Sequence, residues 1–105
     1  MIKKTNETSF VSALKYNAMN ETLSFRNRVV AVEGIMQRAM RFDESEAIPA
    51  LVRVASMSNS SNHDSKLIAD AAVRELRYIE AEGSTGEGSA HLSAGAKAAL
   101  INLRR

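Results

Sequence analysis

The sequence predicts an all-α protein, a small bundle of four to five helices, on three observations. Apolar residues recur every three to four positions along several stretches, which is the period of helices that bury one face. No stretch alternates apolar and polar residues for long enough to form a half-buried strand. The single proline, Pro49, follows a group of acids that can start a helix, and a first-turn proline costs a helix little. We therefore expect one helical domain over residues 1–105.

The first two helices are predicted from a repeated start signal. The triplet Asn-Glu-Thr occurs at residues 6–8 and again at 20–22. Asn or Thr can cap a helix, and the acid favours its positive end. These signals predict helices over about 8–19 and 21–41. The expected buried positions are Phe10, Leu14 and Ala18 in the first helix, and Phe25, Val29, Val32, Met36 and Ala39 in the second.

The rest of the chain predicts a third and fourth helix and a C-terminal one. Asp43 or Ser45 can cap a third helix that reaches about Met57. The polar residues 58–64 favour a loop, because such side chains bond to their own backbone in competition with a helix. Gly83 is a typical helix stop. The expected elements after the loop are a fourth helix over 65–82, a flexible Gly/Ser connector over 83–91, and a C-terminal helix over 92–105 that docks on its own chain or on a second copy.

The composition favours a packed core and excludes thiol chemistry. Hydrophobic residues make up 45% of the chain, and cysteine is absent, so disulfides and sulfur metal ligands are excluded. The longest aliphatic run, residues 29–32, is far shorter than the about 20 residues that a membrane span needs. No apolar segment follows the lysines at positions 3 and 4, as it would in a signal peptide. We expect a soluble, cytoplasmic protein without membrane contact.

Charge is segregated along the chain, although the net charge is only +2. Residues 1–41 carry seven Lys or Arg and three acids, residues 42–87 carry four and nine, and residues 88–105 carry three basic residues and no acid. Three interpretations stay open. The acidic middle can pair with the basic ends of the same chain or of a second copy, a basic face can bind nucleic acid, or the charges lie on ordinary solvated helix faces.

The predicted fourth helix carries more apolar surface than one buried face needs. Its expected core stripe is Ile68, Ala72, Leu76 and Ile79. A second stripe, about 120° away, holds Leu67, Ala71, Arg74 and Tyr78. Because Tyr and Arg are frequent interface anchors, we predict that Leu67, Arg74 and Tyr78 bind a partner. An exposed Val30 on the second helix joins this predicted surface. The alternative is that another helix of the bundle covers the stripe.

A basic face on the second helix is the alternative binding surface. Arg26, Arg28, Arg38 and Arg41 are its members. With the lysines near the N-terminus, these residues could meet the phosphates of a nucleic acid. A helix-turn-helix is not supported, because the loop over 58–64 is longer than the usual turn of that motif. An ordinary solvated basic face explains the same residues.

Residues for catalysis, metal binding or cofactor binding are not grouped in the sequence. The only histidines, His63 and His91, lie in expected polar loops, and no strained nucleophile turn accompanies them. The Gly-rich stretch 83–89 follows a helix and has no adjacent lysine, unlike a phosphate-binding loop. We therefore expect no enzyme, no cofactor and no metal site.

The function that these patterns predict is binding. We expect a non-enzymatic regulatory or adaptor protein that binds another macromolecule, a protein partner first, through its helix faces and that self-associates as a homo-oligomer. A nucleic-acid-binding regulator that uses the basic face of the second helix is the alternative.

Overall fold

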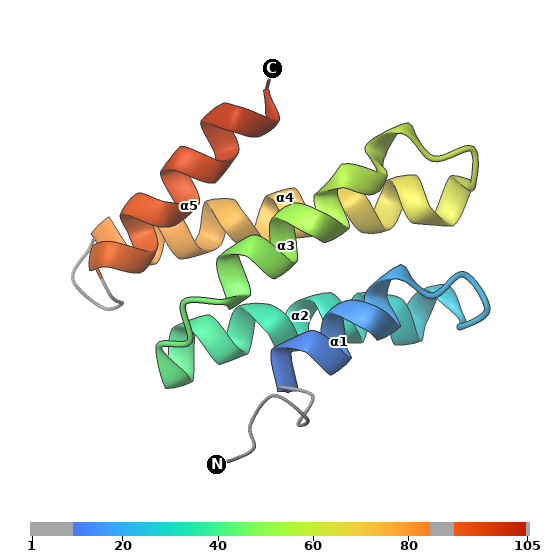
Figure 1. Cartoon of the computed structure of the whole chain (residues 1–105), viewed down its shortest axis with the longest axis horizontal. Coiled ribbons are helices and arrows are strands. Elements are labelled where there is room, and N and C mark those ends of the chain that lie inside the picture. The colour runs from blue at the N-terminus through green and yellow to red at the C-terminus, as the bar shows by residue number, and fades with distance from the viewer. Residues whose placement is uncertain (1–9, 85–89, 105) are drawn as a thin grey trace, which may run out of the picture.

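The computed structural model describes residues 10–84 and 90–104, and these form an all-α bundle (Figure 1). The elements in chain order are α1 (Phe10–Met19), α2 (Phe25–Phe42), α3 (Ala47–Ala55), the 3₁₀-helix η2 (Ser56–Asn59), α4 (His63–Ser84) and α5 (Ala90–Leu103). The described residues contain no strand. The predicted all-α class is confirmed. The predicted start of the first helix, residues 8 and 9, lies outside the described residues.

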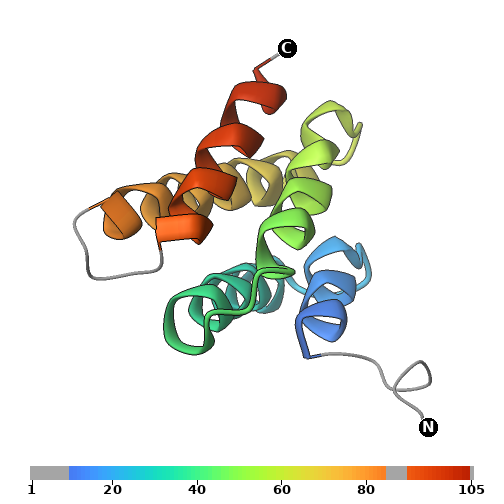
Figure 2. The same cartoon turned by 60° about the vertical axis from the view of Figure 1, so that its left-hand side comes forward.

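The short helix α3 lies at the centre of the bundle. It stands between the α1–α2 pair and the α4–α5 pair, as Figures 1 and 2 show from two directions. It contacts the other four α-helices. Six of its nine residues are buried, and Pro49 sits in its first turn as expected. The surfaces of the molecule are therefore formed mainly by the two outer helix pairs.

The second helix starts four residues later than the sequence predicts. Thr22 donates to Asn20 Oδ1 from its backbone N at 2.9 Å and from its hydroxyl at 2.6 Å, so the polar segment closes on itself as a turn. Ser24 then caps α2, and its Oγ accepts a hydrogen bond from Asn27 N at 3.1 Å. The prediction that Asn20 or Thr22 caps the second helix is therefore wrong, because their hydrogen bonds close a turn and Ser24 is the cap.

The core of α4 matches the sequence pattern, and the core of α2 matches it only in part. Ile68, Ala72, Leu76 and Ile79 are all buried, as expected. In α2, Val32 and Ala39 are buried, but Phe25 is 40% exposed, so the expectation that it lies in the core is wrong. Ile35 and Arg28 are buried there as well. The buried face of α2 is therefore rotated from the predicted seam.

The last helix packs on α4 of the same chain. Leu92, Ala96 and Leu100 are buried, and Ser93 Oγ donates to the carbonyl oxygen of Glu80 at 2.7 Å. Of the predicted connector 83–91, the first two residues continue α4 and the last two begin α5. The remaining residues of that connector, 85–89, lie outside the described residues. Within the described residues, α5 therefore packs as the last helix of the bundle.

Candidate functional site

Arg28, predicted as a nucleic-acid contact, is a buried residue of the bundle interior. It is 1% exposed. Its Nε donates to the carbonyl oxygen of Ala18 at 2.9 Å, and its Nη2 donates to Ser65 Oγ at 2.7 Å and to Met57 Sδ at 3.9 Å. Ser65 in turn donates to the Glu21 carboxylate at 3.3 Å. The prediction that Arg28 meets a phosphate is therefore wrong, because its guanidinium is already bonded inside the fold.

The surroundings of Arg28 explain how a charge is tolerated in the core. Ala18 belongs to the last turn of α1, where the helix dipole places partial negative charge. Ser65 lies in the first turn of α4, where Asn62 Oδ1 accepts a hydrogen bond from the Ser65 backbone N at 2.9 Å. One guanidinium therefore joins the end of α1 to the start of α4 through charge-assisted hydrogen bonds.

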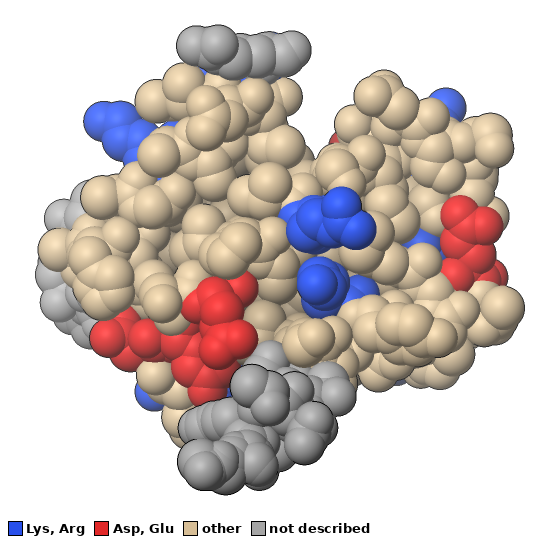
Figure 3. Space-filling view, viewed as in Figure 1, with Lys and Arg blue, Asp and Glu red and all other residues tan. Residues whose placement is uncertain are grey.

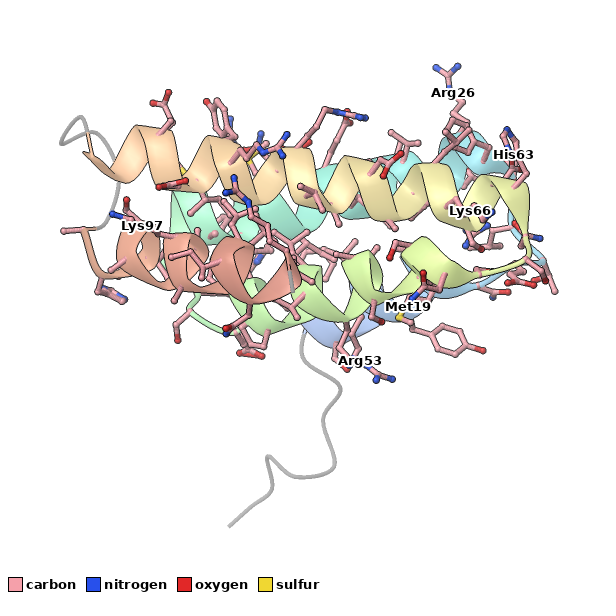
Figure 4. The ribbon with its side chains drawn as sticks, turned by 90° about the horizontal axis from the view of Figure 1, so that it is seen from above. Met19, Arg26, Arg53, His63, Lys66 and Lys97 are labelled. Carbon is pink, nitrogen blue, oxygen red and sulfur yellow. The ribbon has the colours of Figure 1, made fainter. Side chains whose placement is uncertain are left out.

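The other three arginines of the predicted basic face do not form one surface. Arg26 is exposed and extends away from the bundle in Figure 4. Arg41 is also exposed, but it lies 15 residues further along α2, which is about 22 Å of helix. Arg38 is partly buried, and its Nη2 donates to Glu44 Oε2 at 2.6 Å. Only Arg26 and Arg41 are left as exposed cations of the predicted set.

Arg38 lies between two aromatic rings. Its guanidinium carbon is 4.7 Å from the ring centre of Phe10 and 4.1 Å from that of Phe42, which is the geometry of a cation–π contact. The hydrogen bond to Glu44, with the attraction of that carboxylate, raises the pKa of Arg38. Its Nε is buried and has no hydrogen-bond partner within the described chain. Rings and carboxylate together fix this side chain at the edge of α2.

Val30 and the two rings beside Arg38 surround one open hollow, which we call the α1–α2 groove. The side chains of Phe10, Val30 and Phe42 are 58%, 57% and 56% exposed. The groove has a volume of about 440 Å³. Its lining residues are Phe10, Leu14, Val30, Gly34, Gln37, Arg38, Arg41 and Phe42. The structure therefore brings Val30 together with Arg38 and Arg41, residues that the sequence assigned to two different surfaces.

A glycine lets the two helices approach at the floor of the groove. A Cβ atom at Gly34 would lie 3.2 Å from Leu14 Cδ1 and Cδ2, which is tighter than an ordinary contact. A second hollow of about 380 Å³ adjoins the groove, because both are lined by Leu14 and Val30. The apolar surface therefore continues along the α1–α2 seam.

The predicted partner residues on α4 form a separate exposed face. Leu67, Arg74 and Tyr78 are all exposed, so no described helix covers them, while Ala71 of the same stripe is buried. None of the three lines the α1–α2 groove. Val30 is exposed as expected, but it belongs to the groove and does not extend the α4 face.

Phe10 and Phe42 are the functional candidates that sequence reasoning missed. Phe10 was expected in the core, because its spacing from Leu14 fits a buried stripe, yet it is the first described residue and lies over Arg38. Phe42 was assigned to a helix end and given no role. The only signal for Phe42 was a large apolar residue directly before the acids that end α2. Exposure at such a position depends on where α1 lies, which the sequence does not show.

The two histidines lie in different helices, and the described residues hold no group of metal ligands. His63 begins α4, while His91 lies at the start of α5, beyond the other end of α4 (Figure 1). Within residues 10–84 and 90–104, no three His, Asp or Glu side chains are grouped to hold a metal ion. None of the described helices is both long and apolar enough to span a bilayer. The α1–α2 groove and the exposed α4 face are the candidate binding surfaces.

Comparisons with protein-family models, curated proteins and solved structures gave no significant match to this chain. Function is therefore inferred from the surfaces described above.

Proposed function

We propose that this chain is a non-enzymatic regulatory or adaptor protein that binds a protein partner through the α1–α2 groove. One observation carries the proposal: three large apolar side chains, all more than half exposed, surround a single hollow between two helices. Exposed apolar side chains that occur singly are ordinary, but a contiguous group beside a hollow is typical of an interaction site. Self-association and a cytoplasmic location are further parts of the same proposal.

The chemistry of the groove favours an amphipathic segment with acidic side chains as the partner. Phe10, Val30 and Phe42 offer apolar contacts from both sides of a groove between two helices, a shape that suits the apolar face of a third helix. Arg41 is exposed at the same hollow and can pair with an acid of the partner. Aromatic residues and arginine are the types that most often dominate binding energy.

A protein partner fits the charges better than a nucleic acid does. Arg28 is buried and Arg38 is already bonded to Glu44, so the basic face loses two of its four members. Asp43 follows directly after Phe42 and Glu46 lies four residues beyond it, and both would repel phosphates. The α4 face, with Tyr78 exposed, supplies a second surface of the same apolar and cationic character for a protein partner.

A photo-crosslinking amino acid at position 30 tests the proposal. In cells that naturally express the chain, we expect a defined protein adduct from position 30 and none from position 59, an exposed site in η2 outside the groove. The partner is then purified and its affinity measured. Val30→Glu is expected to weaken binding at least about tenfold, because it places a charge in an apolar contact.

Two controls make the result interpretable. Asn59→Glu adds the same charge outside the groove and should bind like the wild type. Circular dichroism should show an unchanged melting transition for Val30→Glu, since Val30 is 57% exposed. Equal affinity of Val30→Glu and wild type, or adducts at position 30 that consist of nucleic acid, would contradict the proposal.

A further inference from the structure

A basic hollow lies between α4 and α5, away from the α1–α2 groove. It has a volume of about 380 Å³ and is lined by Arg77, Glu80, Lys97, Leu100, Ile101 and Arg104. Lys97 and Arg104 are seven residues apart, so they project from the same side of α5. Figure 4 shows Lys97 on the side of α5 that faces α4. The hollow therefore combines three cations and the carboxylate of Glu80 with the apolar side chains of Leu100 and Ile101.

The cations of the basic hollow are available to an external anion. Arg77, Lys97 and Arg104 are all exposed. Among the described residues, none of them forms an ion pair with a carboxylate. Ile101 is half-exposed in the hollow. A ligand that fits this hollow carries carboxylates or phosphates around an apolar group.

An acidic corner lies where α2 passes into α3, and its charge is opposite in sign to that of the basic hollow. We define it as Phe42, Asp43 and Glu46, all exposed. Figure 3 shows acidic side chains gathered where α2 passes into α3. Asp43 has a left-handed backbone with φ of 55°, and its N–H donates to the carbonyl oxygen of Ala39 at 3.1 Å, so the corner is held in place. An exposed ring thus stands beside two carboxylates on a fixed turn.

We propose that copies of this chain associate head to tail, with the acidic corner of one copy seated in the basic hollow of the next. Phe42 of the first copy would cover Leu100 and Ile101 of the second, while Asp43 and Glu46 meet the cations of the basic hollow. Charge complementarity supports this contact, because the hollow carries three cations against one carboxylate, Glu80, while the corner carries Asp43 and Glu46 beside Phe42, whose ring also contacts Arg38. The sequence is divided in the same way, with an acidic middle segment and a basic C-terminal segment.

The proposed contact has a direction, from the corner of one copy to the hollow of the next. The two docking surfaces are different, so the interface is heterologous, and repeated association yields rings or open chains instead of a closed pair. The head-to-tail contact is one form of the self-association proposed above and rests on that part of the proposed function. It shares Phe42 with the α1–α2 groove but does not use Val30 or Phe10.

Two neutralising variants test the contact. The hollow variant is Arg77→Gln with Lys97→Gln, and the corner variant is Asp43→Asn with Glu46→Gln. Asn tolerates the left-handed backbone at position 43, so the turn should be kept. In sedimentation velocity at low salt, the wild-type mass should rise with concentration past the dimer. In about 0.5 M salt it should fall toward the monomer, because screening shortens the reach of surface charges.

The mixture of the two variants gives the sharpest result. Each variant alone should remain a monomer, because each lacks one of the two docking surfaces. A one-to-one mixture should stop at a dimer, in which the intact corner of the hollow variant docks in the intact hollow of the corner variant. Association that continues past the dimer in the mixture would overturn the proposal, as would variants that each self-associate like the wild type.

A matched control separates the site from net charge. Arg53→Gln with Lys66→Gln removes two exposed cations that lie outside the hollow, and Figure 4 shows them on α3 and at the far end of α4. This control should associate like the wild type. A wild type that stays monomeric, or one whose hollow binds a single-stranded oligonucleotide without self-association, would overturn the head-to-tail contact. Neither result would change the outcome of the crosslinking test at position 30, so the two proposals can fail separately.

Discussion

The two ends of α2 each hold an arginine, and the structure uses them in opposite ways. Near the start of the helix, Arg28 is 1% exposed and bonds to a carbonyl, a hydroxyl and a sulfur from three other segments. Ten residues later, Arg38 stays at the surface, where it contacts two phenylalanine rings and bonds to Glu44. One arginine holds the interior together, and the other forms part of a surface.

The difference teaches that position on a helix does not decide what an arginine does. The partners within reach decide it. Arg28 meets the carbonyl end of α1 and the first turn of α4, where hydrogen bonds can satisfy a buried guanidinium. Arg38 meets a carboxylate and two exposed rings, which fix its charge at the edge of an apolar groove. Substitutions at these sites test whether the two arginines differ in this way.

The largest expected effect is that of Arg28→Ala. The substitution leaves the Ala18 carbonyl and the Ser65 hydroxyl without their partner and opens a cavity in the core. We expect the free energy of unfolding to fall by roughly 3 kcal/mol or more. Urea denaturation followed by circular dichroism measures the change. A loss of less than about 1 kcal/mol would mean that Arg28 is not a structural residue.

A smaller effect is expected for Arg38→Ala. The side chain is partly exposed, and its ion pair with Glu44 lies near the surface, so the loss of stability should be clearly smaller than the loss for Arg28→Ala. Glu44→Gln should give a similar or smaller loss, and the double variant should show coupling between the two sites. The same denaturation experiment checks both. A loss for Arg38→Ala that equals the loss for Arg28→Ala would remove the contrast between the two ends of α2.

The smallest effect is expected for Glu75→Gln, which removes a half-buried charge that the structure tolerates poorly. Burial raises the pKa of Glu75, the nearby Glu33 raises it further, and Arg74 partly opposes the shift. Because the folded-state pKa is raised, Glu75 favours the fold when protonated, and that contribution is lost as the pH rises through the raised value. Glu75→Gln should therefore be more stable than the wild type at neutral pH, by on the order of a few tenths of a kcal/mol.

The pH dependence provides the check on Glu75. The advantage of Glu75→Gln should disappear below the ordinary carboxyl value of 4.5, where the wild-type side chain is protonated in both states. Glu33→Gln should shift stability in the same direction by less. A stability difference that does not change between neutral and acid pH would show that the carboxylate charge is not its cause.

The sequence predicted the elements that depend on local pattern. The α4 stripe from Ile68 to Ile79 is buried as expected, because one long amphipathic helix needs only its own period to define its core face. The exposure of Val30 was also predicted from its place opposite the buried positions of α2. The late start of α2 at Phe25 was not predicted, because the Asn20 side chain bonds to Thr22 and closes a turn before the helix begins.

The features that were missed require the placement of two or more helices. From the sequence, Arg28 is predicted as a surface charge, because its partners Ala18 and Ser65 come from α1 and α4. Phe10 and Phe42 lie far apart in the sequence, and the fold brings both rings to Arg38. The basic hollow likewise needs α5 against α4 before Arg77 and Lys97 face the same space. The local period of apolar residues does not predict these contacts between helices.

The Arg28 network has a consequence for how the molecule opens. Its guanidinium is bonded to α1 and to α4 and touches η2 between them in sequence, so separating any one of these segments breaks bonds to the others. The three segments therefore form one cooperative unit whose backbone amides become accessible to solvent together. Arg38 and its contacts at the opposite end of α2 share no hydrogen bond with this network, so they can rearrange without breaking it.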